Sequence, residues 1–167
     1  MPAITATRAF PPRAYLFPHR QSELDQLFQT LDSPETGELS GVYRGTLFAI
    51  KGIDTLPSWL RRGVYHLLMT PLNPWRGKRF DGDHGANIWF SRSGQWAFGV
   101  YAVIPCANRE EALNLDYNQG VNPALLRPIL GEVRKINEGY YLARMRYRTR
   151  RSTHTLLYFT LQRDNQR

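Results

Sequence analysis

Cysteine is nearly absent from this chain of 167 residues, which contains one, Cys106. A single cysteine cannot form a disulfide within the chain, and this residue usage indicates a cytoplasmic protein. The chain is long enough to bury roughly 70% of its unfolded surface, so a core forms without crosslinks. A catalytic thiolate needs a histidine or cation beside it, and the first cation after Cys106 is Arg109. We therefore interpret Cys106 as chemically inert.

Long apolar runs are also missing. No stretch reaches the roughly 18 apolar residues that a membrane-spanning helix requires, so we expect no membrane span. The first 21 residues contain four prolines and no continuous apolar segment, which is not typical of a signal peptide. We expect residues 1–21 to form an extended arm and residues 22–167 to form a single domain.

Acidic residues are in short supply: 22 lysines and arginines stand against 14 aspartates and glutamates, for a net charge of +8. Such a charge attracts anions at long range. Single-stranded nucleic acid would require aromatic and cationic side chains on one exposed surface. In Tyr140–Arg150 the two kinds alternate and so point to opposite faces of a strand. Nucleic acid is therefore disfavoured as a partner.

Metal and cofactor motifs are lacking as well. The four histidines are scattered, and neither a His-x-x-x-His spacing nor a pair of cysteines occurs. A glycine-rich phosphate loop, a nucleophile elbow and a dinucleotide fingerprint are also missing. We expect no metal and predict no cofactor, although a haem held by one histidine stays open.

Two segments of the N-terminal half predict short helices. Ser22 can cap the first, in which apolar residues recur at helical spacing through Leu31. The second is Leu56–Thr70, with Pro57 in its first turn. We expect these helices to plug or flank a sheet.

The rest of the chain predicts six or seven strands joined mostly by tight turns, at Ser93-Gly94 and Asn137-Glu138-Gly139 among others. The strands are expected at Gly41–Ile50, Asn87–Ser91, Gln95–Ile104, Ala112–Asn118, Gly131–Ile136, Tyr140–Arg150 and Thr153–Arg163. This order predicts a mainly β fold, an antiparallel meander closed or nearly closed into a barrel.

Two short motifs carry a family resemblance. Gly41-Val42-Tyr43-Arg44-Gly45 resembles the motif that names the GXWXG family, with Tyr43 in place of tryptophan. Trp75-Arg76-Gly77-Lys78-Arg79-Phe80 resembles the same family's downstream Trp-x-Gly-Lys-x-Phe segment, at a wider spacing. The tail, Ile129–Asp164, resembles the uncharacterised domain that usually follows. The resemblance implies a β-barrel with a hydrophobic cup and implies no reaction.

The glycine and aromatic of the first strand are also similar to the opening of lipocalin-like barrels. In those barrels a first-strand aromatic closes the floor and packs against a cation from a late strand. The resemblance implies that Tyr43 takes the first role and that Arg163 or Arg144 takes the second.

The segment Asn73–Phe90 is our candidate binding region because it combines glycines, aromatic rings and cations. Its rings offer apolar walls, and Lys78, held by its neighbours, is the best candidate for contacting a carboxylate or phosphate. Tyr141, Met145 and Tyr158 are expected to point inward beside it. The full set of candidate ligand-binding residues is Tyr43, Arg44, Trp75, Lys78, Phe80, Asn87, Trp89, Tyr141, Met145 and Tyr158.

Three functions remain open. The first is a small-molecule binding protein whose ligand is apolar or aromatic and anionic. The second is a small hydrolase or isomerase in which His84 acts as a base at the barrel mouth, oriented by Asp81 or Asp83. The third is an RNA-binding module. We favour the binding protein over the enzyme because a histidine on an exposed loop is the more common explanation for a residue such as His84.

Overall fold

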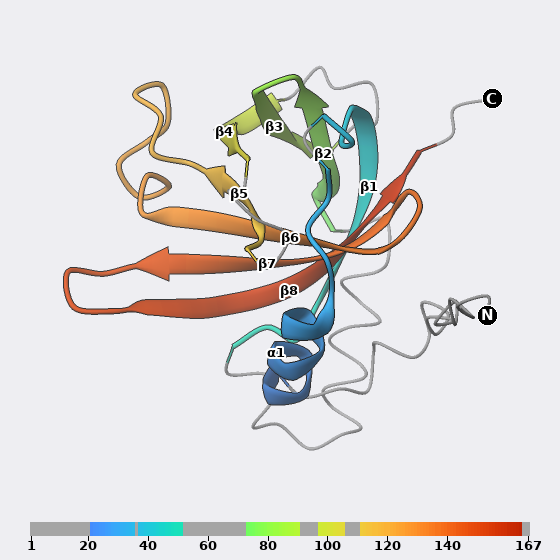
Figure 1. The fold of residues 1–167 in the computed structure, drawn as a ribbon. Helices are drawn as coiled ribbons and strands as arrows, with labels where there is room; N and C mark the ends of the chain where they lie inside the picture. The colour runs from blue at the N-terminus through green and yellow to red at the C-terminus, as the bar shows by residue number, and fades with distance from the viewer. Residues whose placement is uncertain (1–20, 36, 52–72, 91–96, 106–110, 165–167) are drawn as a thin grey trace, which may run out of the picture.

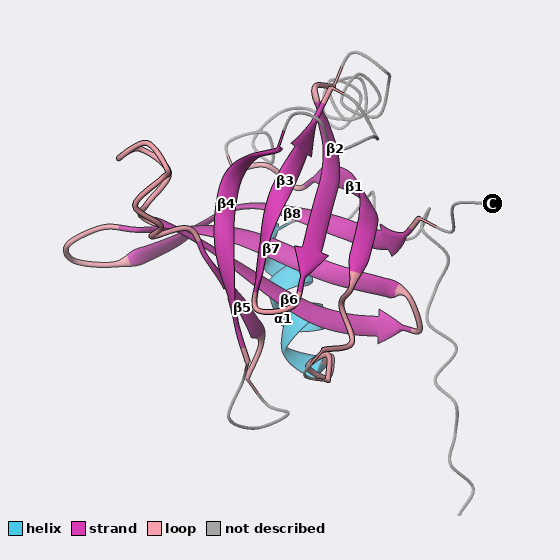
Figure 2. Cartoon of the chain, turned by 90° about the horizontal axis from the view of Figure 1, so that it is seen from above, coloured by secondary structure: helices cyan, strands magenta, loops and turns pink. Residues whose placement is uncertain are grey.

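The computed structural model describes residues 21–35, 37–51, 73–90, 97–105 and 111–164. Eight antiparallel strands form a closed barrel in which sequence neighbours pair and β1 pairs with β8 (Figures 1 and 2). The strands are β1 (Gly41–Phe48), β2 (Trp75–Asp81), β3 (His84–Trp89), β4 (Ala97–Ile104), β5 (Leu113–Asp116), β6 (Ile129–Asn137), β7 (Tyr140–Arg148) and β8 (Thr153–Arg163). The predicted meander is therefore present, and it is closed.

The C-terminal strands match their predictions closely. Strand β8 has the expected bounds, and the turn between Asn137 and Tyr140 joins β6 to β7 as expected. The prediction of six or seven strands was wrong by the omission of β2. The Asn73–Phe90 segment is mostly a hairpin, in which β2 and the whole of β3 flank a turn at Gly82.

An irregularity explains why β2 was missed. The register of the β2–β3 pair shifts between Trp75 and Gly77, so Trp75 and Lys78 both face the interior although they are three residues apart. Strict alternation would place them on opposite faces. Gly77 has φ +148°, and a Cβ there would lie 1.9 Å from the Tyr43 carbonyl oxygen. Only glycine lets β1 and β2 approach this closely.

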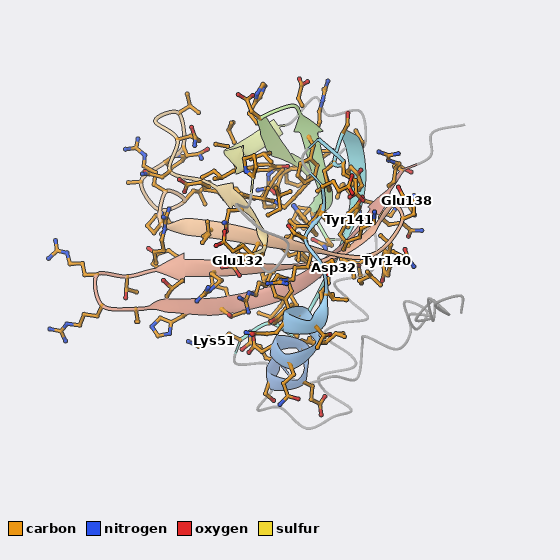
Figure 3. All side chains as sticks on the ribbon, in the orientation of Figure 1. Asp32, Lys51, Glu132, Glu138, Tyr140 and Tyr141 are labelled. Atoms are coloured by element: carbon orange, nitrogen blue, oxygen red, sulfur yellow. The ribbon has the colours of Figure 1, made fainter. Side chains whose placement is uncertain are left out.

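The interior of the barrel is packed with the side chains that alternation turns inward. On β7, Tyr141, Ala143 and Met145 join this core, as predicted, and the intervening Leu142 and Arg144 face outward. Trp75 lies flat against Gly45, where an added Cβ would come within 2.1 Å of the indole ring. Figure 3 draws the side chains on the ribbon, with Tyr141 of this core labelled.

Helix α1 (Gln21–Thr30) flanks the barrel on its outside (Figure 1). Its apolar side, Leu24 and Phe28, packs on Leu142 and Tyr158 from β7 and β8. The Arg144 guanidinium lies 4.4 Å from the centre of the Phe28 ring and forms a 3.2 Å ion pair with Asp25. The second predicted helix, Leu56–Thr70, and residues 1–20 of the predicted arm (1–21) lie outside the described residues, and Gln21 is the first residue of α1.

One end of the barrel is closed by aromatic rings and a late-strand cation; we call it the Tyr43 end. Tyr43 packs edge-on against Phe80 and Tyr141 at 5.4 and 5.7 Å between ring centres. Arg163 covers the Tyr43 ring at 5.8 Å, so the predicted pairing with Arg163 is present. The alternative, Arg144, was wrong because that side chain points outward beneath α1.

The opposite end, which we call the Trp89 end, is packed less tightly. It is formed by the end of β1, β3, β5 and β7 and the start of β2, β4, β6 and β8. Most of the partly buried apolar side chains that pack on the barrel core lie toward this end, although Trp75 here is 7% exposed, and Val103 is a partly buried side chain at the Tyr43 end. The partly buried side chains toward the Trp89 end are Leu47, Trp89, Ile129, Met145 and Leu157. Solvent therefore touches the apolar lining at the Trp89 end.

Candidate functional site

Lys78 is the central residue of the site, and the β2–β3 hairpin positions it. Lys78 pairs in register with Tyr43 on β1 and with Asn87 on β3, and all three side chains point into the barrel. The lysine has 0% of its surface exposed. A fully buried lysine is rare in proteins unless it is paired or functional.

Polar contacts converge on the amide of Asn87. The Lys78 ammonium nitrogen donates to Asn87 Oδ1 at 2.7 Å and to the Tyr117 hydroxyl. The Tyr117 hydroxyl donates to the same Asn87 Oδ1 at 3.1 Å, and the Trp75 indole N–H donates to it at 3.3 Å. Asn87 therefore accepts hydrogen bonds from two side chains of β2 and from Tyr117, which directly follows β5.

Aromatic rings surround the lysine. Its Nζ lies 4.7, 5.0 and 5.4 Å from the ring centres of Tyr101, Tyr117 and Phe159. Such contacts stabilise a cation, but less than water does. Burial lowers the pKa of Lys78 to about 7, so the amine is close to half charged at neutral pH.

No acidic side chain among the described residues forms an ion pair with Lys78. Glu132 and Asp116 neutralise the outer arginines of β7, whereas no carboxylate in the described part of the chain pairs with this amine. A buried cation without a counter-charge is costly. The site would therefore gain from an anion.

Donors also outnumber acceptors in this cluster. Lys78, Tyr117 and Trp75 together offer more N–H and O–H groups than the two lone pairs of Asn87 Oδ1 can accept. Burial raises the pKa of the Tyr117 hydroxyl, which keeps it protonated and able to donate. An oxygen acceptor supplied by a ligand would relieve this imbalance.

Eight of the ten candidate ligand-binding residues lie on the inner face of the barrel. Tyr43, Phe80 and Tyr141 form the closed end, and Trp75, Lys78 and Asn87 form the polar cluster above them. Trp89 and Met145 lie among the partly buried lining of the Trp89 end.

The remaining two candidates do not face the interior, and the prediction that Tyr158 points inward was wrong. Arg44 faces outward, with 43% of its side chain exposed, and lies 3.9 Å from Asp164. Tyr158 lies beneath α1, where its hydroxyl donates to Asp25 at 2.5 Å. Leu156, Leu157, Tyr158 and Phe159 form an unbroken apolar run, so alternation cannot say which side of this strand faces inward.

The position of His84 does not provide the geometry that the enzyme alternative requires. His84 and Asp83 lie at the tip of the β2–β3 hairpin, at the Tyr43 end, a strand length from Trp75 and Trp89. His84 Nδ1 is 2.8 Å from Asp83 Oδ1, and 62% of the histidine side chain is exposed. The hydrogen bond with Asp83 raises the pKa of His84. The prediction that His84, Asp81 and Asp83 share a mouth with the tryptophans was wrong.

Three residues that contact Lys78 were not predicted: Tyr101, Tyr117 and Phe159. Tyr117 alternates with Leu113 and Leu115 in the sequence, so the pattern was sufficient to place it on their side. What the pattern did not contain was the proximity of Tyr117 to Lys78, 39 residues away.

The outer arginines of β7 are neutralised by acids. Arg144 and Arg146 both contact Glu132, at 2.5 and 2.8 Å, and Arg148 contacts Asp116 at 2.6 Å. These ion pairs do not favour RNA binding along the outer face of β7. In the described ranges, no group of three or more metal-binding side chains gathers, and no helix is long and apolar enough to cross a membrane.

Comparison with known proteins gives a fold and no activity. No family model matches the chain, and no curated protein matches it in sequence. The chain is similar to a solved structure described as a protein from Thermomonospora curvata, at 21% identity and a TM-score of 0.60. The likeness covers 91% of this chain and 93% of that chain. It shows that the barrel is a fold shared over nearly the whole length.

Proposed function

We propose that this protein is a lipocalin-like barrel that binds one small apolar or aromatic molecule carrying an anionic group. The ligand lies at the Trp89 end, with its apolar part against the partly buried lining and its acidic group toward Lys78. The observation that carries the proposal is Lys78 itself, a fully buried cation with no acidic partner among the described residues.

Shape supports the proposal as well. An eight-stranded barrel has an interior that either is filled by side chains or holds one small ligand. In this barrel the two ends differ. The Tyr43 end is filled by packed rings, and the Trp89 end exposes apolar side chains to solvent. A pocket with apolar walls and a few convergent polar groups is typical of small-molecule sites.

The two motif segments lie side by side, which supports the proposed family. Gly41 pairs with Phe80 and Tyr43 pairs with Lys78, so the GXWXG-like segment and the Trp-x-Gly-Lys-x-Phe-like segment form one two-stranded unit. We propose membership of the GXWXG family on this basis. A cytoplasmic location stays a prediction from the single cysteine.

The test uses two probes with the same ring skeleton. 1-Anilinonaphthalene-8-sulfonate is anionic, and N-phenyl-1-naphthylamine lacks the sulfonate. We expect both to quench tryptophan fluorescence and the sulfonate to bind at least tenfold more tightly at pH 6. A tenfold difference corresponds to about 1.4 kcal/mol, a modest value for a buried charge interaction.

Lys78→Met should remove the preference for the sulfonate and leave binding of the neutral probe in place. Lys51→Met, which removes an exposed lysine, is the matched control and should change neither affinity. If neither probe binds the native protein, the barrel is not a site for such ligands. Equal affinities in the native protein would remove Lys78 from the proposal.

A further inference from the structure

The amine of Lys78 has a contact set that suits a neutral nucleophile. Its nitrogen has two partners, Asn87 Oδ1 and the Tyr117 hydroxyl. A neutral amine has two N–H groups, and these two partners accept both of them. The nitrogen lone pair is then left without a partner, inside an apolar environment that favours the uncharged form.

We propose that Lys78 forms a reversible imine with an apolar or aromatic aldehyde bound in the barrel. The inference rests on the proposed function, because the aldehyde must occupy the same part of the interior. It adds a second class of ligand: a carbonyl compound that is held covalently, whereas an anion is held by charge.

The chemistry balances without an oxidant or a reductant. The nitrogen lone pair attacks the carbonyl carbon, the carbonyl π electrons move to oxygen, and a proton passes from nitrogen to that oxygen to give a carbinolamine. The carbon–oxygen bond then breaks as the C=N bond forms, and the oxygen leaves as water. The second nitrogen proton is lost in this step, so one amine and one aldehyde give one imine and one water.

Tyr117 is placed to relay the protons. Its hydroxyl touches the Lys78 nitrogen and also donates to Asn87 Oδ1 at 3.1 Å. It can give its proton to the departing oxygen while it recovers one from the nitrogen, so no isolated phenolate forms. The Asn87 oxygen orients both groups and also accepts the Trp75 N–H at 3.3 Å.

The other described lysines lack this environment. Lys135 forms ion pairs of 2.6 Å with Glu38 and 3.1 Å with Glu138, and its pKa is raised by the bond with Glu38. Lys51 is exposed. At pH 7 the uncharged fraction of Lys78 exceeds that of a lysine with the ordinary value of 10.5 by about a thousandfold.

The experiment is reductive trapping. The full-length protein is incubated at pH 7 with 2-naphthaldehyde and sodium cyanoborohydride, and the products are measured by intact mass and peptide mapping. We expect one adduct per chain, located at Lys78, with trapping suppressed by 1-anilinonaphthalene-8-sulfonate. Lys51→Met should react as the native protein does, and Lys78→Arg should lose the adduct.

The variant Tyr117→Phe tests the proton relay through the Tyr117 hydroxyl separately from binding of the ligand. We expect trapping at saturating 2-naphthaldehyde to slow at least tenfold. Affinity for 2-naphthalenemethanol, which cannot form an imine, is measured for both proteins, so that a loss of binding is separated from a loss of the relay. Because this comparison and the sulfonate competition use binding-competent protein, a failure of Lys78→Arg to fold would not affect them.

The outcomes distinguish the two proposals. Binding of 2-naphthalenemethanol without trapping of the aldehyde at Lys78 would overturn the imine and leave the binding function standing. Adducts spread over surface lysines would overturn it equally. If neither compound binds, both proposals fail.

Discussion

At the scale of single residues, Lys78 is the most unusual feature of the molecule. It lies at the centre of a barrel, surrounded by three rings, an amide and a phenol, with no exposed surface. Its environment destabilises the charged form, so the folded protein holds the Lys78 proton less tightly than the unfolded chain does. Retaining such a residue costs stability, which is expected where function requires a poised group.

The cost can be measured as a pH dependence. The pKa of Lys78 is about 7 in the folded protein and 10.5 in a free lysine, so between these values the unfolded chain binds more protons. The free energy of unfolding of the native protein should therefore rise with pH, relative to Lys78→Met, by up to about 1.4 kcal/mol per pH unit. Urea unfolding of both proteins from pH 6 to pH 10 measures the difference.

The free energy of unfolding of Lys78→Met should exceed that of the native protein most below pH 7, and the difference should shrink as the pH rises. Lys51→Met controls for the loss of a lysine, and its difference from the native protein should stay flat. Parallel curves for the native protein and Lys78→Met would mean that the buried amine titrates normally.

At the scale of elements, the close approach of β1 and β2 sets the position of the site. Gly45 allows the Trp75 ring to lie on β1, and Gly77 allows the strands to approach at the bulge. The bulge turns both Trp75 and Lys78 inward, toward Asn87. Helix α1 contributes from outside by covering β7 and β8.

Gly45→Ala should destabilise the protein by about 1–3 kcal/mol, because the new methyl group would overlap the Trp75 ring at 2.1 Å and force it to move. The movement should also alter tryptophan fluorescence. Gly120→Ala is the control, since nothing lies within 4 Å of a Cβ at that position. Equal stabilities of the two variants in urea would contradict the packing of Trp75 on Gly45.

Phe28→Ala should cost about 3–5 kcal/mol, because the ring is buried between Tyr158 and the Arg144 guanidinium. The amides of α1 should then exchange with solvent faster, since a helix of 10 residues is marginal without tertiary contacts. Phe90→Ala removes a ring that is 70% exposed and should change stability by less than about 0.5 kcal/mol. Unchanged exchange of the α1 amides in Phe28→Ala would contradict this docking.

At the scale of the whole molecule, closure and charge act together. The closed sheet leaves no unpaired edge and encloses Lys78 in a low-dielectric interior. The net charge of +8 surrounds that interior with a positive field, although the arginines of β7 are locally neutralised by Glu132 and Asp116. Such a field draws anions toward the molecule before they reach the site.

The association rate of 1-anilinonaphthalene-8-sulfonate should therefore fall several-fold between about 0.01 and 0.5 M salt, as screening shortens the reach of the field. The rate for N-phenyl-1-naphthylamine should stay constant, because that probe carries no charge. Stopped-flow fluorescence measures both rates. If salt changed both rates equally, the effect would come from the apolar lining that both probes contact and not from the electrostatic field.

The alternation of apolar and polar residues in the sequence was sufficient to predict most strands of the barrel. Alternation in Tyr140–Arg150 and the bounds of β8 were predictable because side chains on a strand alternate whatever lies around them. The same logic placed Tyr141 and Met145 inside. The pairing of Arg163 with the Tyr43 ring came from the resemblance to lipocalin-like barrels, which left Arg144 as the alternative. The β2 strand was hidden, because the bulge and the inward lysine break the alternation that identifies a strand.

The sequence by itself determined a mainly β meander, the candidate hairpin and the candidate cation, because these depend on residues close together in the chain. Only the tertiary structure decided that Lys78 is buried without an acid, that Tyr117 reaches it, and that His84 lies at the other end from Trp89. It also placed Tyr158 outside and Phe159 inside. Register and closure bring together residues distant in sequence, and the electrostatic environment of a buried group follows from those neighbours.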